Sequence, residues 1–142
     1  MKFVIDEVTK FMDELVPFNQ FLGLHLESIS EGEAVMVLPF RKELIGDPHR
    51  PALHGGVVST LIDTTGGAAV WSGAEPSDRV STVDLRVDFL RPGPLEDLAC
   101  EAKVVRLGNH VGATTMRVYG RSDPERTIAT GSGVYNVRRA RD

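Results

Sequence analysis

The chain has a single cysteine, no long apolar run and little excess charge over its 142 residues. Cys100 alone cannot form an intramolecular disulfide, which favours a reducing compartment and predicts a cytoplasmic location. No run approaches about 18 uninterrupted apolar residues and no charged-then-apolar leader opens the chain, so neither a membrane span nor export is indicated. The net charge of −4 argues against a nucleic-acid partner, because such proteins normally present a basic face.

Several common catalytic motifs are also missing from the sequence. It contains no Gly-x-Ser-x-Gly elbow, Walker loop, G-x-G-x-x-G motif, H-E-x-x-H motif or cysteine pair. The spacing of Asp47, His49 and His54 fits no zinc pattern, so we expect no metal and no cofactor. Cys100 lies in an alternating run and is expected to be a core residue rather than a nucleophile. The one basic cluster, residues 138–141, is expected to be a solvated tail.

Apolar periodicity predicts one α+β domain over residues 1–142. Residues 1–16 are expected to form an amphipathic helix that Pro17 ends. Residues 21–39 hold two strand-like runs around a polar turn. The last three strands are joined only by short turns, which implies an antiparallel meander. We expect these strands at residues 98–106, 111–121 and 127–137.

An alternating run, residues 82–93, gives the clearest strand pattern in the sequence. Apolar and polar residues alternate along it, and its apolar side is expected to pack on a central helix through Val83, Leu85, Val87 and Phe89. A proline-containing, charged loop at residues 41–52 precedes that helix. This loop is expected to bring Asp47 and His49 close to His54.

The stretch from Leu53 to Val70 is long and apolar enough to be the core helix. Its apolar residues fall on one side at helical spacing: Val58, Leu61, Ile62, Thr65 and Ala69. The opposite side carries an acid, Asp63, on a strip of small residues that also holds Gly56, Thr60 and Gly67. A carboxylate there is costly to desolvate unless it has partners or a role. Asp63 is therefore either a paired structural acid or the candidate catalytic acid.

The start of this helix offers hydrogen-bond donors. Pro51 and the Gly55-Gly56 pair predict a turn into the helix, whose first N–H groups lack intrahelical partners. Such donors suit an oxyanion, and one of them stabilises a transition state by roughly 3 kcal/mol. Gly55 precedes Asp63 by about 12 Å along the helix axis, so one carbonyl cannot touch both. If the two cooperate, a second subunit must supply one of them, which predicts a two-fold dimer with composite sites.

The run His54-Gly55-Gly56, followed by Leu61-Ile62-Asp63 and by the strand at residues 82–93, resembles the signature of the hotdog-fold acyl-CoA thioesterases. The likeness is strongest to the phenylacetate-degradation (PaaI-like) branch, and it covers about residues 21–137. It implies an antiparallel sheet of five to six strands wrapped around one long central helix, here with an extra N-terminal helix. It also implies a homodimer, which in similar proteins often pairs into a homotetramer; the sequence leaves dimer and tetramer open.

The resemblance further implies hydrolysis of an acyl-CoA or aryl-CoA thioester. In that chemistry the Gly55 N–H binds the oxyanion, while Asp63 of the partner subunit acts as general base or as nucleophile. Thr82 matches the position whose hydroxyl helps to hold the attacking water, and Ser81 is a competing choice. His54 either orients the loop or the substrate carbonyl, or is a purely structural residue.

One position departs from the pattern of this family. Asp47 stands where an asparagine commonly helps to bind the thioester oxygen or the water, and an ionised aspartate can only accept hydrogen bonds. Two rival functions stay open: a non-catalytic acyl-CoA binding module, and a hotdog dehydratase or hydratase. For the substrate we expect contacts from Gly56, from Trp71 in an apolar pocket, and from Arg91 at the CoA phosphates.

Overall fold

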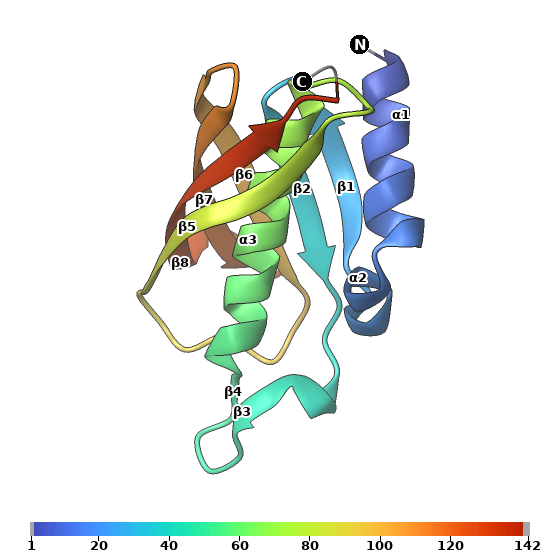
Figure 1. The fold of residues 1–142 in the computed structure, drawn as a ribbon. Coiled ribbons are helices and arrows are strands. Elements are labelled where there is room, and N and C mark those ends of the chain that lie inside the picture. The colour runs from blue at the N-terminus through green and yellow to red at the C-terminus, as the bar shows by residue number, and fades with distance from the viewer. Residues whose placement is uncertain (1, 141–142) are drawn as a thin grey trace.

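The computed structural model describes residues 2–140 of the chain; Met1 and Arg141, which belong to the predicted helix and the predicted basic tail, lie outside them. A six-stranded antiparallel sheet, in the order β1-β2-β6-β7-β8-β5, wraps around one long helix, α3 (Figure 1). The predicted α+β architecture is thus confirmed. The strands are β1 (His25–Ser30), β2 (Glu33–Leu38), β5 (Arg79–Phe89), β6 (Leu98–Leu107), β7 (Val111–Gly120) and β8 (Asp123–Arg138).

Helix α3 (Gly55–Ser72) lies where the apolar periodicity predicts it. The predicted apolar side is buried against the sheet, and Leu61 and Ile62 are fully enclosed in the core. The strip on the other side is exposed or half-buried, and Asp63 stands on it one turn before Gly67. Helix α3 therefore holds the acid midway along its length, outside its buried face. Within residues 2–140, no helix has both the length and the apolar character of a membrane span.

The N-terminal segment differs from the single helix that the sequence predicts. Helix α1 (Lys2–Lys10) runs into a π-helical turn, η1 (Phe11–Leu15), and Pro17 then begins a second helix, α2 (Pro17–Leu22), instead of ending the first. Proline is favoured at the first position of a helix, where a missing N–H costs nothing. Helix α2 ends at Gly23, whose φ of 75° suits glycine. The strand expected from residue 21 therefore begins only after this helix.

The charged loop before α3 contains more structure than predicted. A 3-10 turn, η2 (Lys42–Leu44), leads into a hairpin of β3 (Ile45–Asp47) and β4 (Ala52–Leu53). The His54 N–H donates to the Leu44 carbonyl over 2.8 Å. This hydrogen bond fixes the base of the hairpin against the start of α3.

Strand β5 lies at the edge of the sheet, and its predicted apolar side packs only in part. Leu85 and Val87 are half-buried against the core, whereas Val83 and Phe89 are 65% and 54% exposed. A bulge just after Thr82 shifts the pairing with β8 by one residue. Because side chains alternate between the faces of a sheet, the bulge turns Thr82 to the same face as Leu85 and leaves Val83 outside. The bulge thereby aims the Thr82 hydroxyl at α3.

The meander of β6, β7 and β8 is confirmed, although its last turn is tighter than predicted. Gly120 pairs with Asp123, so only two residues form the turn and β8 begins four residues earlier than expected. The Glu96 carboxylate accepts hydrogen bonds from the Ser122 N–H and hydroxyl over 2.9 and 2.8 Å. These bonds hold the tight turn to the segment just before β6.

Two adjacent glycines in α3 lie against one buried tyrosine. Tyr135 projects from β8 and is 1% exposed. A Cβ on Gly66 would clash with the phenol oxygen and lie 3.0 Å from the ring carbon Cζ. A Cβ on Gly67 would meet the same ring at 3.6 Å, which is an ordinary contact. Packing therefore requires a glycine at position 66 and only permits one at position 67.

We expect Gly66→Ala and Gly67→Ala to change stability in opposite directions. Alanine is favoured over glycine inside a helix by about 1 kcal/mol, so Gly67→Ala should raise the free energy of unfolding by about that amount. Gly66→Ala should lower it by about 2 kcal/mol, because the buried ring cannot move away from the added methyl group. Urea unfolding measures both values. Shifts of the same sign would show that the ring of Tyr135 does not distinguish the two positions.

Candidate active site

Asp63 lies midway along α3 and is oriented by strand β5. Its carboxylate oxygen Oδ1 accepts a hydrogen bond from the Thr82 hydroxyl over 2.7 Å. Ser81, the competing candidate, lines the same pocket, but the bond to the acid comes from Thr82. The bulge in β5 and this hydrogen bond together fix the direction in which the carboxylate points.

Tyr135 contacts the acid-bearing residue from the sheet. Its hydroxyl donates to the main-chain carbonyl of Asp63 over 2.9 Å. Burial, together with the nearby Asp63 carboxylate, raises the pKa of the Tyr135 phenol above its ordinary value, so the hydroxyl keeps its proton and can donate. No sequence pattern singles out Tyr135. The Gly66-Gly67 pair is the signal that could have found it, because paired glycines inside a helix often mark a close approach.

A pocket of about 200 Å³ opens beside Asp63. Its apolar lining comes from the N-terminal segment, from the second half of α3 and from β5, through Phe11, Met12, Val16, Gly67, Trp71 and Val80. Four residues that the sequence analysis names as separate candidates line this one pocket: Asp63, Trp71, Ser81 and Thr82. The pocket therefore combines a carboxylate with walls suited to an apolar group.

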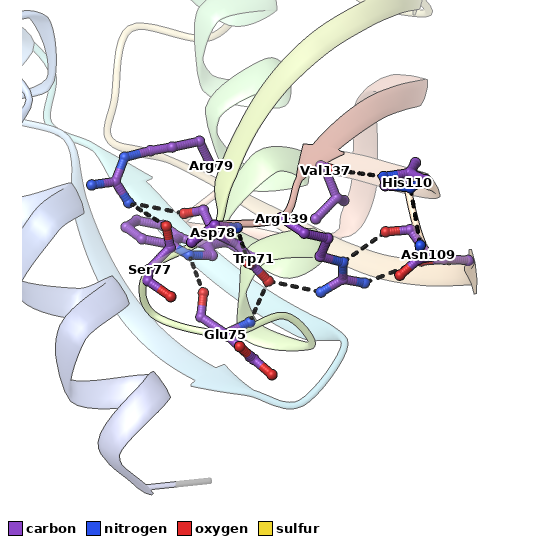
Figure 2. Close-up of polar contacts among 11 residues, drawn as sticks. Trp71, Glu75, Ser77, Asp78, Arg79, Asn109, His110, Val137 and Arg139 are labelled. Atoms are coloured by element: carbon purple, nitrogen blue, oxygen red, sulfur yellow. Dashed lines mark hydrogen bonds and ion pairs between the residues drawn. The ribbon is translucent and has the colours of Figure 1, made fainter. Parts of the chain in front are cut away.

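Trp71 lines this pocket, and a series of polar contacts connects it to a buried ion pair (Figure 2). The Trp71 indole N–H donates to the Glu75 carbonyl over 3.2 Å, and the Glu75 N–H donates to the Asp78 carboxylate over 2.9 Å. Asp78 is 1% exposed, and the Arg139 guanidinium lies 2.7 Å from its carboxylate. Arg139 also donates to the Asn109 carbonyl over 2.7 Å. This series of bonds holds the indole ring in one orientation.

The predicted solvated tail is therefore wrong at Arg139, whose side chain is only 11% exposed. Asp78 lies 61 residues earlier in the chain, so no local pattern links the two. A buried carboxylate needs a counter-charge, and Arg139 supplies it.

Removing one member of this ion pair should destabilise the fold strongly. Arg139→Ala leaves the Asp78 carboxylate buried without its counter-charge, and such a loss typically costs about 3–5 kcal/mol. Arg138→Ala, at the exposed neighbouring position, should change the free energy of unfolding by less than about 0.5 kcal/mol. Denaturant unfolding compares the two variants. Equal losses would show that the whole tail, and not this ion pair, carries the effect.

The pH dependence of stability gives a second measure of the same pair. Burial raises the pKa of Asp78, but the Glu75 and Ala140 N–H groups and the Arg139 guanidinium together hold it below its ordinary value. A native pKa below the unfolded pKa adds stability at higher pH, and this stability is lost as the pH falls through the native pKa. We expect the free energy of unfolding to fall below about pH 4, and to fall less in Arg139→Ala.

The start of α3 leaves one backbone donor free. His54 caps the helix, because its ring nitrogen Nδ1 accepts a hydrogen bond from the Gly56 N–H over 2.8 Å. The neutral ring therefore carries its proton on Nε2. The Gly55 N–H has no acceptor among residues 2–140, as expected for the first residue of a helix. Gly55 is thus the donor available to an oxyanion, while the Gly56 donor is used by the cap.

Gly55 borders a second pocket, of about 320 Å³, together with Phe89 and Arg91. The Phe89 ring would lie 3.4 Å from a Cβ at position 55, so it packs directly against the helix start. Asp63 does not line this pocket, and Gly55 does not line the pocket beside Asp63. A site that uses both groups therefore needs two copies of α3.

Two residues considered from the sequence lie apart from both pockets. The Asp47 carboxylate accepts hydrogen bonds from the N–H groups of His49 and Arg50 over 2.9 and 3.1 Å, and so stabilises its own hairpin. Cys100 is fully buried, and burial raises the pKa of its thiol to about 12, which confirms a core residue rather than a nucleophile. Within the described residues, no three His, Cys, Asp or Glu side chains gather as metal ligands.

Known structures share this architecture. A thioesterase family protein from Silicibacter pomeroyi has a TM-score of 0.86 and 29% sequence identity, over 94% of this chain and 98% of that chain. The Escherichia coli PaaI protein from the phenylacetic acid degradation operon has a TM-score of 0.84 and 24% identity, over 97% of this chain and 95% of that chain. The sheet wrapped around one acid-bearing helix is the hotdog fold of thioesterases.

Sequence comparison then defines the family. The family described as "Thioesterase superfamily" matches residues 51–126. A Halobacterium salinarum protein, designated an esterase without confirmation, is 39% identical over 126 residues, which are 84% of this chain and 83% of that protein. The medium/long-chain acyl-CoA thioesterase YigI of Escherichia coli is 27% identical over 135 residues, which are 86% of each chain. The chain belongs to the thioesterase superfamily, and its general chemistry is thioester hydrolysis.

Proposed function

We propose that this protein hydrolyses the thioester of an acyl-CoA or aryl-CoA to a free acid and CoA. The proposal depends on one arrangement: the Asp63 carboxylate is oriented by Thr82 on a pocket wall, and the same helix begins with the free N–H of Gly55. The acyl-CoA thioesterase activity named for YigI supports the choice of a CoA ester as substrate.

The acid and the amide have different tasks in this mechanism. The Gly55 N–H, at the positive end of α3, binds the thioester oxygen as it becomes negatively charged. Asp63 takes a proton from the attacking water as general base, or attacks the carbonyl carbon itself as nucleophile. The tetrahedral intermediate then breaks its C–S bond and expels the CoA thiolate, a good leaving group that needs no strong general acid. With Asp63 as general base, this step gives the free acid directly, and the proton taken up by Asp63 passes to the thiolate or to solvent. With Asp63 as nucleophile, it gives an acyl anhydride of Asp63, which a water molecule hydrolyses to the free acid and the restored carboxylate.

The remaining polar groups orient the reactants. The Thr82 hydroxyl positions the carboxylate and the water beside it, and Ser81 lies within the same pocket. The His54 Nε2–H is the donor that this ring offers toward the substrate carbonyl. The Asp47 carboxylate cannot donate to an oxyanion, so the proposal gives that task to Gly55 and assigns Asp47 to the shape of the hairpin.

We also propose that the site is composite, in a homodimer that pairs into a tetramer. Gly55 and Asp63 of one chain are about 12 Å apart along α3 and border different pockets. A two-fold axis beside the open strip of α3 would set the acid of one helix opposite the amide of its mate. The free edge of β5, with Val83 and Phe89 exposed along it, is a surface that a second copy would cover.

Thiol release from a panel of acyl-CoAs and aryl-CoAs, followed with a thiol-reactive dye, tests the reaction. We expect one free acid for each thiol released, and a solution mass of a dimer or tetramer. Water addition to an enoyl-CoA without thiol release would instead support a dehydratase or hydratase. Saturable binding of acyl-CoA without turnover would support a binding module, and a monomeric mass at working concentration would reject the composite site.

A further inference from the structure

Three residues at a spacing of four follow one face of α3 into the pocket: Asp63, Gly67 and Trp71. Positions i, i+4 and i+8 stack above one another along a helix. A group bonded to the carbonyl carbon beside Asp63 would therefore pass over Gly67 and reach the indole of Trp71. This path is about 12 Å long, from the helical rise of eight residues.

Gly67 keeps this path open. It is half-buried, and a Cβ there would meet only the Tyr135 ring, at 3.6 and 3.9 Å. Packing does not require a glycine at this position, in contrast to Gly66. A glycine that the helix does not need, on the wall of a pocket and one turn beyond the acid, is explained if an apolar group occupies the space above it.

The indole at the end of the path is buried and held in place. The Trp71 ring is 5% exposed and packs edge-to-face on Phe11, with ring centres 4.8 Å apart. Its indole N–H is bonded to Glu75, which the ion pair of Asp78 and Arg139 fixes in turn, as Figure 2 shows. The polar groups of this series are therefore already hydrogen-bonded. The Arg79 guanidinium, which also lines the pocket, donates to the Ser77 and Asp78 carbonyls.

In the opposite direction from Asp63 lies a second, more open groove. There the groove is bordered by Ser59 and Thr60 on α3 and by the exposed Phe18 on α2. The CoA part of a thioester is long and polar and ends in phosphates, which must stay in solvent. The more enclosed pocket, which ends at the buried Trp71, therefore suits the acyl group, and the more open groove suits CoA.

We propose that the pocket between η1 and the second half of α3 is the acyl-binding site, that it takes a medium-length aliphatic acyl chain, and that Gly67 and Trp71 set the length accepted. This inference rests on the proposed thioester hydrolysis and adds its substrate class. Each methylene that enters the pocket should raise kcat/KM roughly fourfold, until the chain reaches Trp71. Longer chains should gain nothing further.

The test compares kcat/KM for acetyl-, butanoyl-, hexanoyl-, octanoyl- and palmitoyl-CoA in the wild-type protein, Gly67→Ala and Gly67→Leu. Gly67→Leu should lower kcat/KM for octanoyl-CoA by more than about tenfold, equivalent to two buried methylenes, and change the acetyl-CoA value by less than about twofold. For octanoyl-CoA, the kcat/KM of Gly67→Ala should lie between the values of the wild-type protein and Gly67→Leu. A uniform loss over all chain lengths would overturn the proposal, and so would an unchanged profile.

Phe18→Ala tests the direction of the chain. It alters the other end of the groove, so the dependence on chain length should keep its shape. A shift of the length preference in Phe18→Ala, without one in Gly67→Leu, would place the acyl group at the open end and overturn the proposal.

A binding measurement separates this inference from the proposed reaction. Trp71 is the only tryptophan in the chain, so its fluorescence reports directly on the end of the pocket. In the Asp63→Asn protein, octanoyl-CoA should change this fluorescence saturably, and free CoA or acetyl-CoA should not. Binding of octanoyl-CoA with no fluorescence change would overturn the acyl site alone. A saturable change in Asp63→Asn, together with no thiol release from any ester by the wild-type protein, would support the acyl site and overturn the hydrolysis.

Discussion

Asp63→Asn is expected to lower kcat for thioester hydrolysis by about a thousandfold. Asparagine keeps the size of the side chain and the oxygen that accepts the Thr82 hydrogen bond. Its amide can neither take a proton from water nor attack a carbonyl carbon. Because the acid acts in the transition state rather than in binding, the loss should appear in kcat and leave KM within a few-fold. Steady-state thiol release measures both constants.

The matched control for this substitution is Asp123→Asn. Asp123 is an exposed acid at the start of β8, and its replacement makes the same change of charge without touching either pocket. It should leave kcat unchanged. Unfolding curves and solution mass should be the same for both variants and the wild type. If Asp63→Asn kept a near-normal rate, the acid would have to be reassigned to a structural role.

Gly55→Pro is expected to lower kcat by about a hundredfold to a thousandfold. Proline removes the one N–H proposed to bind the oxyanion, and the first position of a helix is where proline is best tolerated. His54 already has φ −60° and ψ 130°, the extended geometry that a following proline requires. No hydrogen bond within residues 2–140 is lost, since the Gly55 N–H has no acceptor there.

Gly55→Ala separates the loss of the donor from the addition of bulk. It keeps the N–H, and its Cβ would lie 3.4 Å from the Phe89 ring. This ring is 54% exposed and has space to shift. Gly55→Ala should therefore retain most of the wild-type kcat. Equal losses in the alanine and proline variants would mean that crowding, and not the missing donor, slows the reaction.

Mixing Asp63→Asn with Gly55→Pro should restore part of the activity that each has lost. In a mixed dimer, the proline variant contributes an intact acid and the asparagine variant an intact amide, which together form one complete site. Random pairing makes about half of the dimers mixed, and one of their two sites is complete, so about a quarter of the wild-type rate is expected. No recovery after verified subunit exchange would show that acid and amide act within one chain.

The parts of the fold that sequence predicts well are those set by long, regular patterns. Apolar periodicity along the 18 residues of α3 locates this helix, and the alternation in residues 98–137 locates the meander. Short elements are different. Helix α2 has six residues, too few for a period to emerge, and its apolar Phe21 and Leu22 suit a strand equally well.

The residues of the candidate site also differ in how well the sequence predicts them. Asp63, Gly55 and Thr82 follow from local spacing and from the family signature. Tyr135 and the ion pair of Asp78 with Arg139 depend on contacts between distant parts of the chain, 72 and 61 residues apart. The bulge in β5 is also invisible to an alternation pattern, because one extra residue in the strand reverses the faces on either side of it.

The bond between Arg139 and Asp78 decides where this chain can be shortened or fused. Strand β8 ends at Arg138, and secondary structure alone would suggest a boundary there. A truncation at that residue would remove the counter-ion of a buried carboxylate and release the loop behind Trp71. Expressed fragments and fusions should therefore retain residue 139 and begin any linker beyond it.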